Sequence, residues 1–344
     1  MRVAVWSVVV LLVGHTSTGA QRRTEEIVFR SGDFELVGEL RLPTGEGPHP
    51  VVVFVHGDGP NNRTSGVTYP PIMERMLAAR YATFAWDKPG TGASTGRLDQ
   101  SRVIDQRAQI VLDALAVLAR RSDIDPDQIG LWGISQAGYV MPRVLERTDD
   151  VAFVIAISCP GEPGVEQGGY LVTAQARCSG GLTAEDGLEM ERLLGAIEWA
   201  TTYEEYAQLK SALREYPAFL ALEGQGVFVG VRPESEWHAP NLDGDYFWDP
   251  MSAIARTTVP ILAVFGQKDT QADPVQGVAA YRDALARSGN PHSRVELIPS
   301  TDHNILLSET GCIDERRRRS AAGWRNYPQV YLDLIEEWLT EIRR

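Results

Sequence analysis

Polar and apolar residues alternate in two short stretches near the start of the chain. These stretches, 25–30 and 34–42, flank Ser31-Gly32-Asp33 in the pattern of a β-hairpin. The run Val51-Val52-Val53-Phe54-Val55 then reads as a strand that is buried on both faces. Further strands are predicted at 82–86, in the run that leads to Ser135, and at 151–158, 259–265 and 294–298.

Helical spacing of apolar residues appears between these strands. Helices are predicted over 71–79, 101–121, 139–146, 274–288 and 327–344. An order in which strands and helices alternate is typical of a mostly parallel sheet that is covered by helices on both faces. The sequence therefore predicts the α/β class.

The alternation stops between about 161 and 249. This stretch holds helical pieces near 182–194 and 202–216, followed by a segment rich in Gly, Pro and aromatic residues. The strand pattern resumes at 259, so the sheet is incomplete without the residues that follow. We interpret about 161–249 as a helical cap inserted into one α/β domain that spans 21–344.

Residues 1–20 have the features of a cleaved secretory signal peptide. Arg2 provides a positive start, 3–13 is an apolar stretch too short to span a bilayer, and Thr18-Gly19-Ala20 provides small residues before a cleavage point. No cysteine stands directly after that point, where a lipid would be attached. We therefore expect a secreted or periplasmic protein without a stable membrane anchor.

Composition and charge exclude several classes of protein. With 43% hydrophobic and 23% charged residues, the chain is neither disordered nor fibrous. Its formal net charge of −13 argues against nucleic acid or an anionic membrane as a partner. The basic run 316–319 is a local exception that we expect to form a solvated loop or helix face.

The three cysteines suggest one disulfide. In an oxidising compartment Cys159, Cys178 and Cys312 allow one bridge and one free thiol, and the sequence leaves the pairing open. No Cys-x-x-Cys or His-x-x-x-His spacing is present, so we expect no structural metal site.

The stretch Gly133-Ile134-Ser135-Gln136-Ala137-Gly138 ends an apolar run and precedes a helical pattern. This arrangement predicts a sharp strand-to-helix turn that presents the Ser135 hydroxyl, the nucleophile elbow. Gly133 and Gly138 meet the need for small neighbours, whereas Ala137 departs from the strict pattern, which has glycine there.

A serine nucleophile needs an imidazole base and a carboxylate that orients it. His303 follows the carboxyl end of a late strand, which places it at the same edge of a parallel sheet as Ser135. Asp269 follows another strand end and is preferred as the acid over Asp273 and over Asp302.

An acyl-transfer site also needs backbone N–H donors for the oxyanion. One is expected from Gln136, directly after the serine. We expect the other from Asp58, with Gly59 as the reserve, because the glycines of the segment 56–59 allow close backbone approach. His56, Gly57 and Gly59 are expected to support this loop.

Five motifs together resemble the α/β-hydrolase superfamily, and more narrowly the bacterial serine esterases of its dienelactone-hydrolase and acyl-thioesterase-like branches. They are His-Gly-x-Gly-Pro at 56–60, Asp-x-x-Gly-x-Gly at 87–92, Gly-x-Ser-Gln-x-Gly at 133–138, Gly-x-x-Asp at 266–269 and Asp-His-Asn at 302–304. The resemblance implies an eight-stranded, mostly parallel sheet and cofactor-free ester hydrolysis. It carries over Ser135 as nucleophile, His303 as base and Asp269 as acid, with Asp58 and Gln136 as oxyanion donors.

The leading hypothesis is a secreted hydrolase of small-molecule carboxylic esters. Amide or peptide hydrolysis on the same residues, and a catalytically silent binding protein of this fold, are the alternatives. Trp199, Trp237 and Trp248 are candidates for an apolar pocket beneath the cap. The natural substrate, the acyl length and the oligomeric state stay open.

Overall fold

The computed structural model describes residues 22–66, 68–178, 180, 182–224, 231–239, 244–321 and 326–343. The predicted signal peptide at 1–20 lies outside these residues. Within them, no helix combines the length and the apolar character that crossing a bilayer requires.

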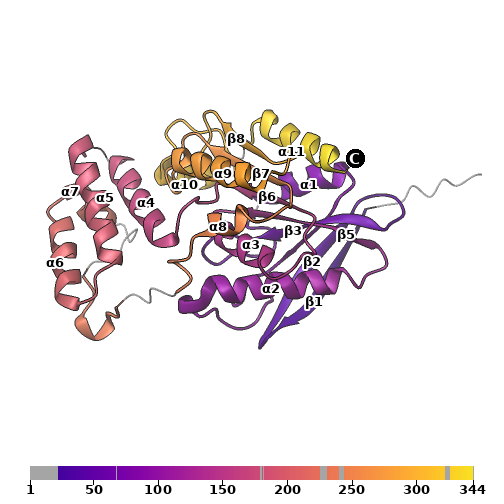
Figure 1. The fold of residues 1–344 in the computed structure, drawn as a ribbon, viewed down its shortest axis with the longest axis horizontal. Coiled ribbons are helices and arrows are strands. Elements are labelled where there is room, and N and C mark those ends of the chain that lie inside the picture. The colour runs from indigo at the N-terminus through magenta and orange to yellow at the C-terminus, as the bar shows by residue number, and fades with distance from the viewer. Residues whose placement is uncertain are drawn as a thin grey trace, which may run out of the picture.

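The centre of the fold is one eight-stranded sheet with the order β1-β2-β4-β3-β5-β6-β7-β8 (Figure 1). Its strands are β1 (Arg23–Ser31), β2 (Phe34–Leu42), β3 (His49–Val55), β4 (Ala82–Trp86), β5 (Ile124–Ile134), β6 (Phe153–Ile157), β7 (Ile261–Gly266) and β8 (Arg294–Ile298). β1 pairs with β2, and β2 with β4, in antiparallel fashion, and the remaining neighbours are parallel. The predicted mostly parallel sheet is confirmed.

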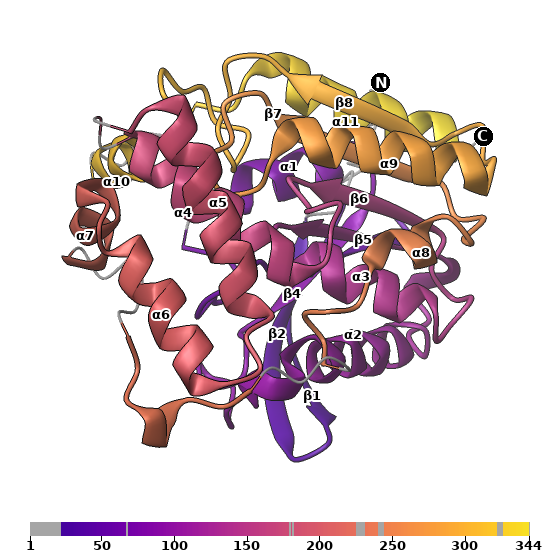
Figure 2. The same cartoon turned by 60° about the vertical axis from the view of Figure 1, so that its left-hand side comes forward.

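Helices cover both faces of the sheet, as Figures 1 and 2 show. One face packs against α1 (Pro70–Ala78) and α11 (Gln329–Ile342). The opposite face packs against α2 (Val103–Leu118), α3 (Ala137–Leu145), α8 (Pro250–Ile254) and α9 (Pro274–Ser288). α2 follows directly on the short 3-10 turn η1 (Gln100–Arg102). Because the central strands are buried on both faces, they appear in the sequence as continuous apolar runs.

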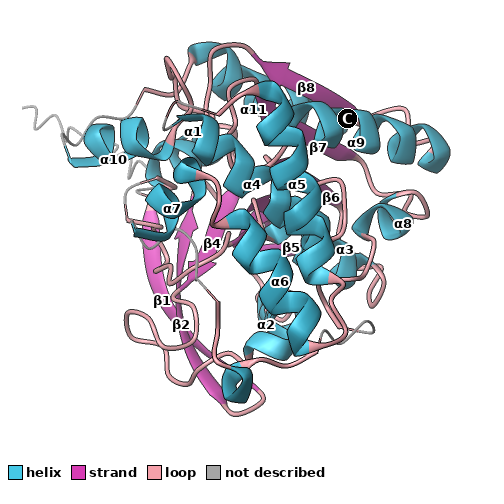
Figure 3. Ribbon diagram, turned by 90° about the vertical axis from the view of Figure 1, so that its left-hand side faces the viewer, coloured by secondary structure: helices cyan, strands magenta, loops and turns pink. Residues whose placement is uncertain are grey.

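The chain between β6 and β7 forms a helical layer with an apolar core of its own. It contains α4 (Gly164–Cys178), α5 (Ala184–Glu198), α6 (Tyr203–Leu213), α7 (Pro217–Gly224) and the short 3-10 turn η2 (Glu234–Glu236). Val172, Met190, Leu194, Tyr206 and Phe219 are among the buried residues that hold these helices together. In Figure 3, α4, α5 and α6 lie between the viewer and the sheet. The apolar pattern predicted α5 and α6 but missed α4 and α7.

The basic run is part of α10 (Ile313–Ala321), and the expectation that it is simply solvated is partly wrong. Arg317 and Arg318 are exposed. Arg319, however, forms an ion pair with buried Asp302, and Arg316 Nη1 donates to Gln271 Oε1 at 2.9 Å. Half of the run therefore braces loops that follow β7 and β8.

Cys178 and Cys312 form the disulfide, and Cys159 is a buried free thiol. Cys178 ends α4, and Cys312 directly precedes α10. The bridge joins positions 134 residues apart, so it ties the helical layer to the chain that follows β8.

We predict that the variant C178S/C312S is less stable than the wild type by about 2–5 kcal/mol, because the crosslink restricts a long loop of the unfolded chain. Chemical unfolding followed by circular dichroism measures the difference. Reductant is expected to lower the wild type to the level of the variant and to leave the variant unchanged. Equal unfolding midpoints for the oxidised wild type and the variant would contradict the prediction.

Candidate active site

Ser135 lies on a strained turn between β5 and α3. Its φ of 58° is in the left-handed region, which a residue with a side chain rarely adopts. The turn is held by a hydrogen bond from Ser135 N to Ile157 O of 3.0 Å, which ties it to the end of β6. The serine is half-buried, so this geometry presents its hydroxyl at the carboxyl edge of the sheet.

The glycines of the turn are required by close packing. A Cβ at Gly133 would lie 2.6 Å from Ala137 Cβ, and a Cβ at Gly138 would lie 2.6 Å from Cys159 Cβ. The departure from the strict motif at Ala137 is thereby explained. The alanine methyl group occupies space that the missing side chain at 133 leaves open.

His303 and Asp269 are directly hydrogen-bonded. The distance from His303 Nδ1 to Asp269 Oδ2 is 2.7 Å, and both side chains are buried. Asp269 Oδ1 accepts hydrogen bonds from the N–H groups of Gln271 and Ala272 at 2.7 and 3.1 Å. The carboxylate is therefore fixed from both oxygens. The carboxylate accepts a hydrogen bond from His303 Nδ1–H, which leaves Nε2 as the nitrogen that can take up a proton.

The two rival aspartates have other partners. Asp273 caps α9 by accepting from the N–H groups of Val275 and Gln276 at 2.8 and 3.3 Å. Asp302 Oδ1 accepts from the N–H of Leu306 at 3.1 Å, and its Oδ2 pairs with Arg319. Of the three candidates, Asp269 is the one that contacts the imidazole.

The sheet order brings the candidate residues to one edge. Ser135 follows β5, Asp269 follows β7 and His303 follows β8, and these parallel strands lie within one contiguous part of the sheet. No hydrogen bond joins Ser135 Oγ to His303 Nε2 within the described residues. Such contacts are often long in an enzyme without substrate and tighten when substrate binds.

The loop after β3 lies against the serine turn. A Cβ at Gly57 would be 3.2 Å from Ile134 O and 3.4 Å from Ser135 Cβ, so glycine allows this approach. His56 braces the loop, because its Nε2 donates to Trp86 O at 2.6 Å while its Nδ1 accepts from Tyr69 Oη at 2.9 Å. Burial lowers the pKa of His56 to about 3, so this imidazole is neutral.

The predicted oxyanion donors have free N–H groups. In the part of the chain that the structure describes, the backbone N–H groups of Asp58, Gly59 and Gln136 have no hydrogen-bond partner. Gln136 is buried at the start of α3, and Asp58 is exposed in the loop. Both groups are therefore available to a ligand, and their role as oxyanion donors stays a prediction.

Sequence reasoning missed two buried cations at this site. Lys88 Nζ donates to Gly57 O at 3.0 Å and to Gly59 O at 2.7 Å. Arg107 of α2 donates to His56 O and to the side-chain oxygen of Gln136. The glycine-rich motif at 87–92 contained Lys88, but helical periodicity gave no sign that Arg107 turns inward.

The helical layer rests on the loop that carries Asp269. Tyr170 Oη donates to Asp269 O at 2.7 Å, and Gln175 Nε2 donates to Thr270 O at 3.0 Å. The side chain of Gln167 also donates to the carbonyl of Gln271. α4 therefore contacts the backbone of three consecutive residues beside His303.

The three tryptophans proposed for a substrate pocket have different surroundings. Trp199 is 52% exposed and packs edge-on against Phe247. Trp237 is partly buried, and its ring packs at a tilt against Tyr206 at the edge of the core of the helical layer. The Trp248 ring lies beneath the guanidinium of Arg143, 3.8 Å from its carbon. Their role as a pocket stays a prediction.

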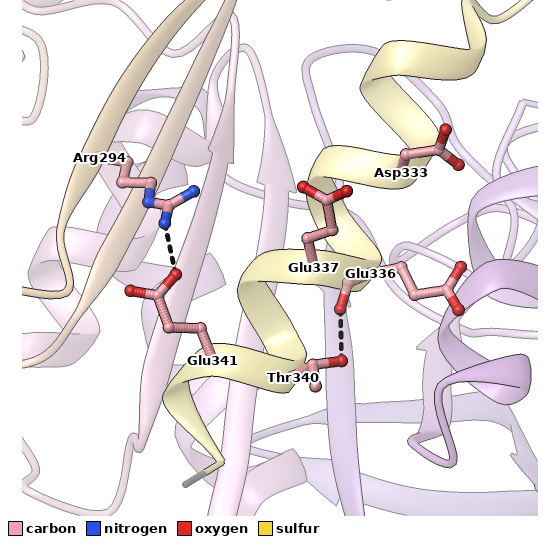
Figure 4. A pocket seen from close by; sticks show the side chains of 6 residues that line it. All are labelled: Arg294, Asp333, Glu336, Glu337, Thr340 and Glu341. Atoms are coloured by element: carbon pink, nitrogen blue, oxygen red, sulfur yellow. Dashed lines mark hydrogen bonds and ion pairs between the residues drawn. The ribbon is translucent and has the colours of Figure 1, made fainter.

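A polar hollow on α11 lies away from these residues. Figure 4 shows its lining, which consists of Arg294, Asp333, Glu336, Glu337, Thr340 and Glu341. Arg294 opens β8, so the hollow lies near the amino end of that strand, whereas His303 follows its carboxyl end. No group of three or more His, Cys, Asp or Glu side chains in the described ranges is arranged to hold a metal ion.

Comparison with known proteins identifies the family of this chain. The family model described as "Alpha/beta hydrolase family" matches residues 52–314. Esterase EstD of Thermotoga maritima is 26% identical over 251 residues, which are 69% of this chain and 50% of that protein. The quorum-quenching protein AidA of Acinetobacter baumannii is 28% identical over 139 residues, 40% of this chain and 44% of that protein. The chain thus spans about half the length of the curated relatives it matches.

Among solved structures, the esterase Pf2001 of Pyrococcus furiosus superposes with a TM-score of 0.55 at 17% identity. The superposition covers 93% of each chain. At this identity the likeness concerns the fold alone.

We predict that Gly138→Ala destabilises the protein by about 1–3 kcal/mol, because the added methyl group overlaps Cys159 in a packed core. Thermal unfolding measures the loss. Gly168→Ala in α4 is the matched control, since a Cβ there has no neighbour within 4 Å. The control is expected to be neutral or up to about 1 kcal/mol more stable, because alanine favours a helix. Equal stability of the two variants would show that the contact at 138 is relaxed.

Proposed function

Because this chain belongs to the α/β-hydrolase family, we propose that it is a serine hydrolase that cleaves carboxylic esters. The family assignment rests on the match over 52–314. The observation that carries the proposal is the 2.7 Å hydrogen bond between buried His303 and Asp269. It lies at the sheet edge where Ser135 occupies a strained turn. These are the three side chains that a Ser-His-Asp mechanism needs.

In the proposed reaction His303 Nε2 accepts the proton of Ser135 Oγ while that oxygen attacks the ester carbonyl. The N–H groups of Asp58 and Gln136 donate to the oxyanion of the tetrahedral intermediate. The intermediate collapses, His303 returns the proton to the leaving alcohol, and an acyl-enzyme remains on Ser135. His303 then deprotonates a water molecule that attacks the acyl group, and the acid and the free serine are released.

Asp269 has two tasks in this scheme. Its hydrogen bond keeps the Nδ1 proton of His303 in place, which leaves Nε2 free to accept a proton. Its negative charge stabilises the imidazolium that forms during each half-reaction. The two N–H groups that bind its other oxygen hold the carboxylate in the required orientation.

The ester as the substrate class and an extracytoplasmic location are parts of the same proposal. Esterase EstD of Thermotoga maritima, with 26% identity over 69% of this chain, supports an ester over other acyl substrates. The Cys178–Cys312 disulfide supports an oxidising compartment, in agreement with the predicted signal peptide.

We predict that Ser135→Ala abolishes hydrolysis of short-chain p-nitrophenyl esters, because the acyl-enzyme cannot form. A fluorophosphonate probe is expected to label the wild type on Ser135, as peptide mass spectrometry would show, and to leave the variant unlabelled. Undiminished turnover in the variant would refute the proposal. If the wild type cleaves p-nitroanilides and not the esters, the proposed activity changes from ester hydrolysis to amide hydrolysis on the same residues.

We predict that Asp269→Asn lowers kcat by roughly 10³- to 10⁴-fold, because the amide no longer favours the productive tautomer of His303. Asp273→Asn is the matched control, since asparagine caps a helix as well as aspartate does and residue 273 does not contact the imidazole. Its kcat is expected to stay near that of the wild type. A large loss at 273 and none at 269 would reassign the acid.

A further inference from the structure

Two buried cations hold the loop after β3 by its carbonyl groups. Lys88 and Arg107 are each 5% exposed. Lys88 Nζ donates to Gly57 O at 3.0 Å and to Gly59 O at 2.7 Å, while Arg107 donates to His56 O. The carbonyl groups of three of the four residues at 56–59 therefore bind a positively charged side chain.

The contact with Gly57 O determines where the next N–H group points. That carbonyl and the N–H of Asp58 belong to one peptide unit, which is trans because Gly47–Pro48 is the cis bond of the described chain. In a planar trans peptide the C=O and the N–H point in opposite directions. When Lys88 binds the carbonyl on one side, the N–H of Asp58 is presented on the other.

Within the part of the chain that the structure describes, neither cation has an anionic partner at hydrogen-bond distance. Among the ion pairs of the described residues, none includes Lys88 or Arg107. Burying a charge without a partner costs free energy, and a neutral side chain would bind carbonyl groups with a smaller penalty. A net positive potential next to the loop is useful where negative charge develops during a reaction.

We propose that Lys88 is a positioning residue that orients the Asp58 N–H toward the oxyanion, with Arg107 as a second support of the same loop. This inference rests on the proposed function, since it assigns the loop to an acyl-transfer reaction. Neither residue touches the reacting atoms, and both act through the peptide groups that they bind.

Arg107 connects the two halves of the proposed oxyanion site. Its guanidinium binds His56 O of the loop and the side-chain oxygen of Gln136, whose own N–H is the second proposed donor. Gln136 Nε2 in turn donates to Tyr246 Oη at 3.3 Å. One side chain of α2 therefore bridges the loop and the serine turn.

The protonation of Lys88 supplies a readout that a purely structural role would not give. Burial, followed by the nearby Arg107, lowers the pKa of Lys88 to about 7, although the Asp58 carboxylate opposes the shift. His56, with its pKa lowered to about 3, stays neutral around this pH. Arg63 and other hydrogen-bond donors lower the pKa of Asp87 despite its burial, so Asp87 stays ionised. A lowered lysine pKa means that the ammonium is present below about pH 7 and is lost as the pH rises through that value.

The test compares Lys88→Met with Lys88→Arg by steady-state hydrolysis of a p-nitrophenyl ester. Removing a whole oxyanion donor costs roughly 10²- to 10³-fold in kcat, so misorienting one through Lys88→Met is expected to cost roughly ten- to a hundredfold, with KM changed little. Lys88→Arg is expected to restore most of kcat. Lys210→Met, which removes a buried lysine of α6, is the matched control for loss of a buried cation and is expected to retain kcat.

The pH profile separates positioning from packing. In the wild type kcat is expected to fall as the pH rises through about 7, and in Lys88→Arg this fall is expected to be absent because the guanidinium stays charged. Should Lys88→Met not fold, as judged by circular dichroism, these two profiles still decide. Identical profiles for the wild type and Lys88→Arg would overturn the role of Lys88.

The affinity for a trifluoromethyl ketone, which forms an oxyanion on the serine, is a further readout. It is expected to weaken in Lys88→Met in proportion to kcat, since both depend on the same N–H donor. Unchanged kcat and unchanged ketone affinity in an active, folded Lys88→Met would refute the inference and leave the proposed function intact. A wild type without Ser135-dependent hydrolysis would refute the proposed function itself.

Discussion

The left-handed backbone at Ser135 constrains the three segments that pack around it, namely the end of β6, α3 and the loop after β3. A residue with a side chain adopts this conformation only where neighbouring structure compensates for the strain. Here the compensation comes from three close approaches, those of the end of β6, of α3 and of the loop after β3. The end of β6 is tied to the turn by the hydrogen bond from Ser135 N to Ile157 O. The other close contacts are possible because Gly57, Gly133 and Gly138 have no side chain. Among the described residues, the N–H groups of Asp58 and Gln136, which lie in the loop after β3 and directly after the serine, have no hydrogen-bond partner.

The helical layer between β6 and β7 is coupled to this site through backbone contacts. α4 binds the carbonyl groups of residues 269–271, and the disulfide attaches its last residue to the segment before α10. From the other side, Arg316 binds Gln271 and Arg319 binds Asp302. The loops that carry Asp269 and His303 are therefore held between α4 and α10.

Charge is distributed unevenly between the surface and the interior. The chain as a whole has a formal net charge of −13, yet Lys88 and Arg107 are buried without an ion pair among the described residues. The acidic surface does not contribute a positive potential to the candidate site. In the inferred arrangement, the two buried cations supply a positive potential next to the loop after β3, in a medium of low dielectric constant.

The sequence by itself determined the sheet and the candidate serine and histidine. Strands buried on both faces need continuous apolar runs, and the chirality and order of α/β units then place the residues after β5 and β8 at one edge. It did not determine which carboxylate binds His303, because Asp269, Asp273 and Asp302 all lie in loops at that edge. The side-chain contacts of the tertiary structure decided which of them it is. The tertiary structure also decided that Cys178 pairs with Cys312. α4 and the inward-facing Lys88 and Arg107 also escaped notice, since local periodicity carries no information on contacts between residues far apart in the chain.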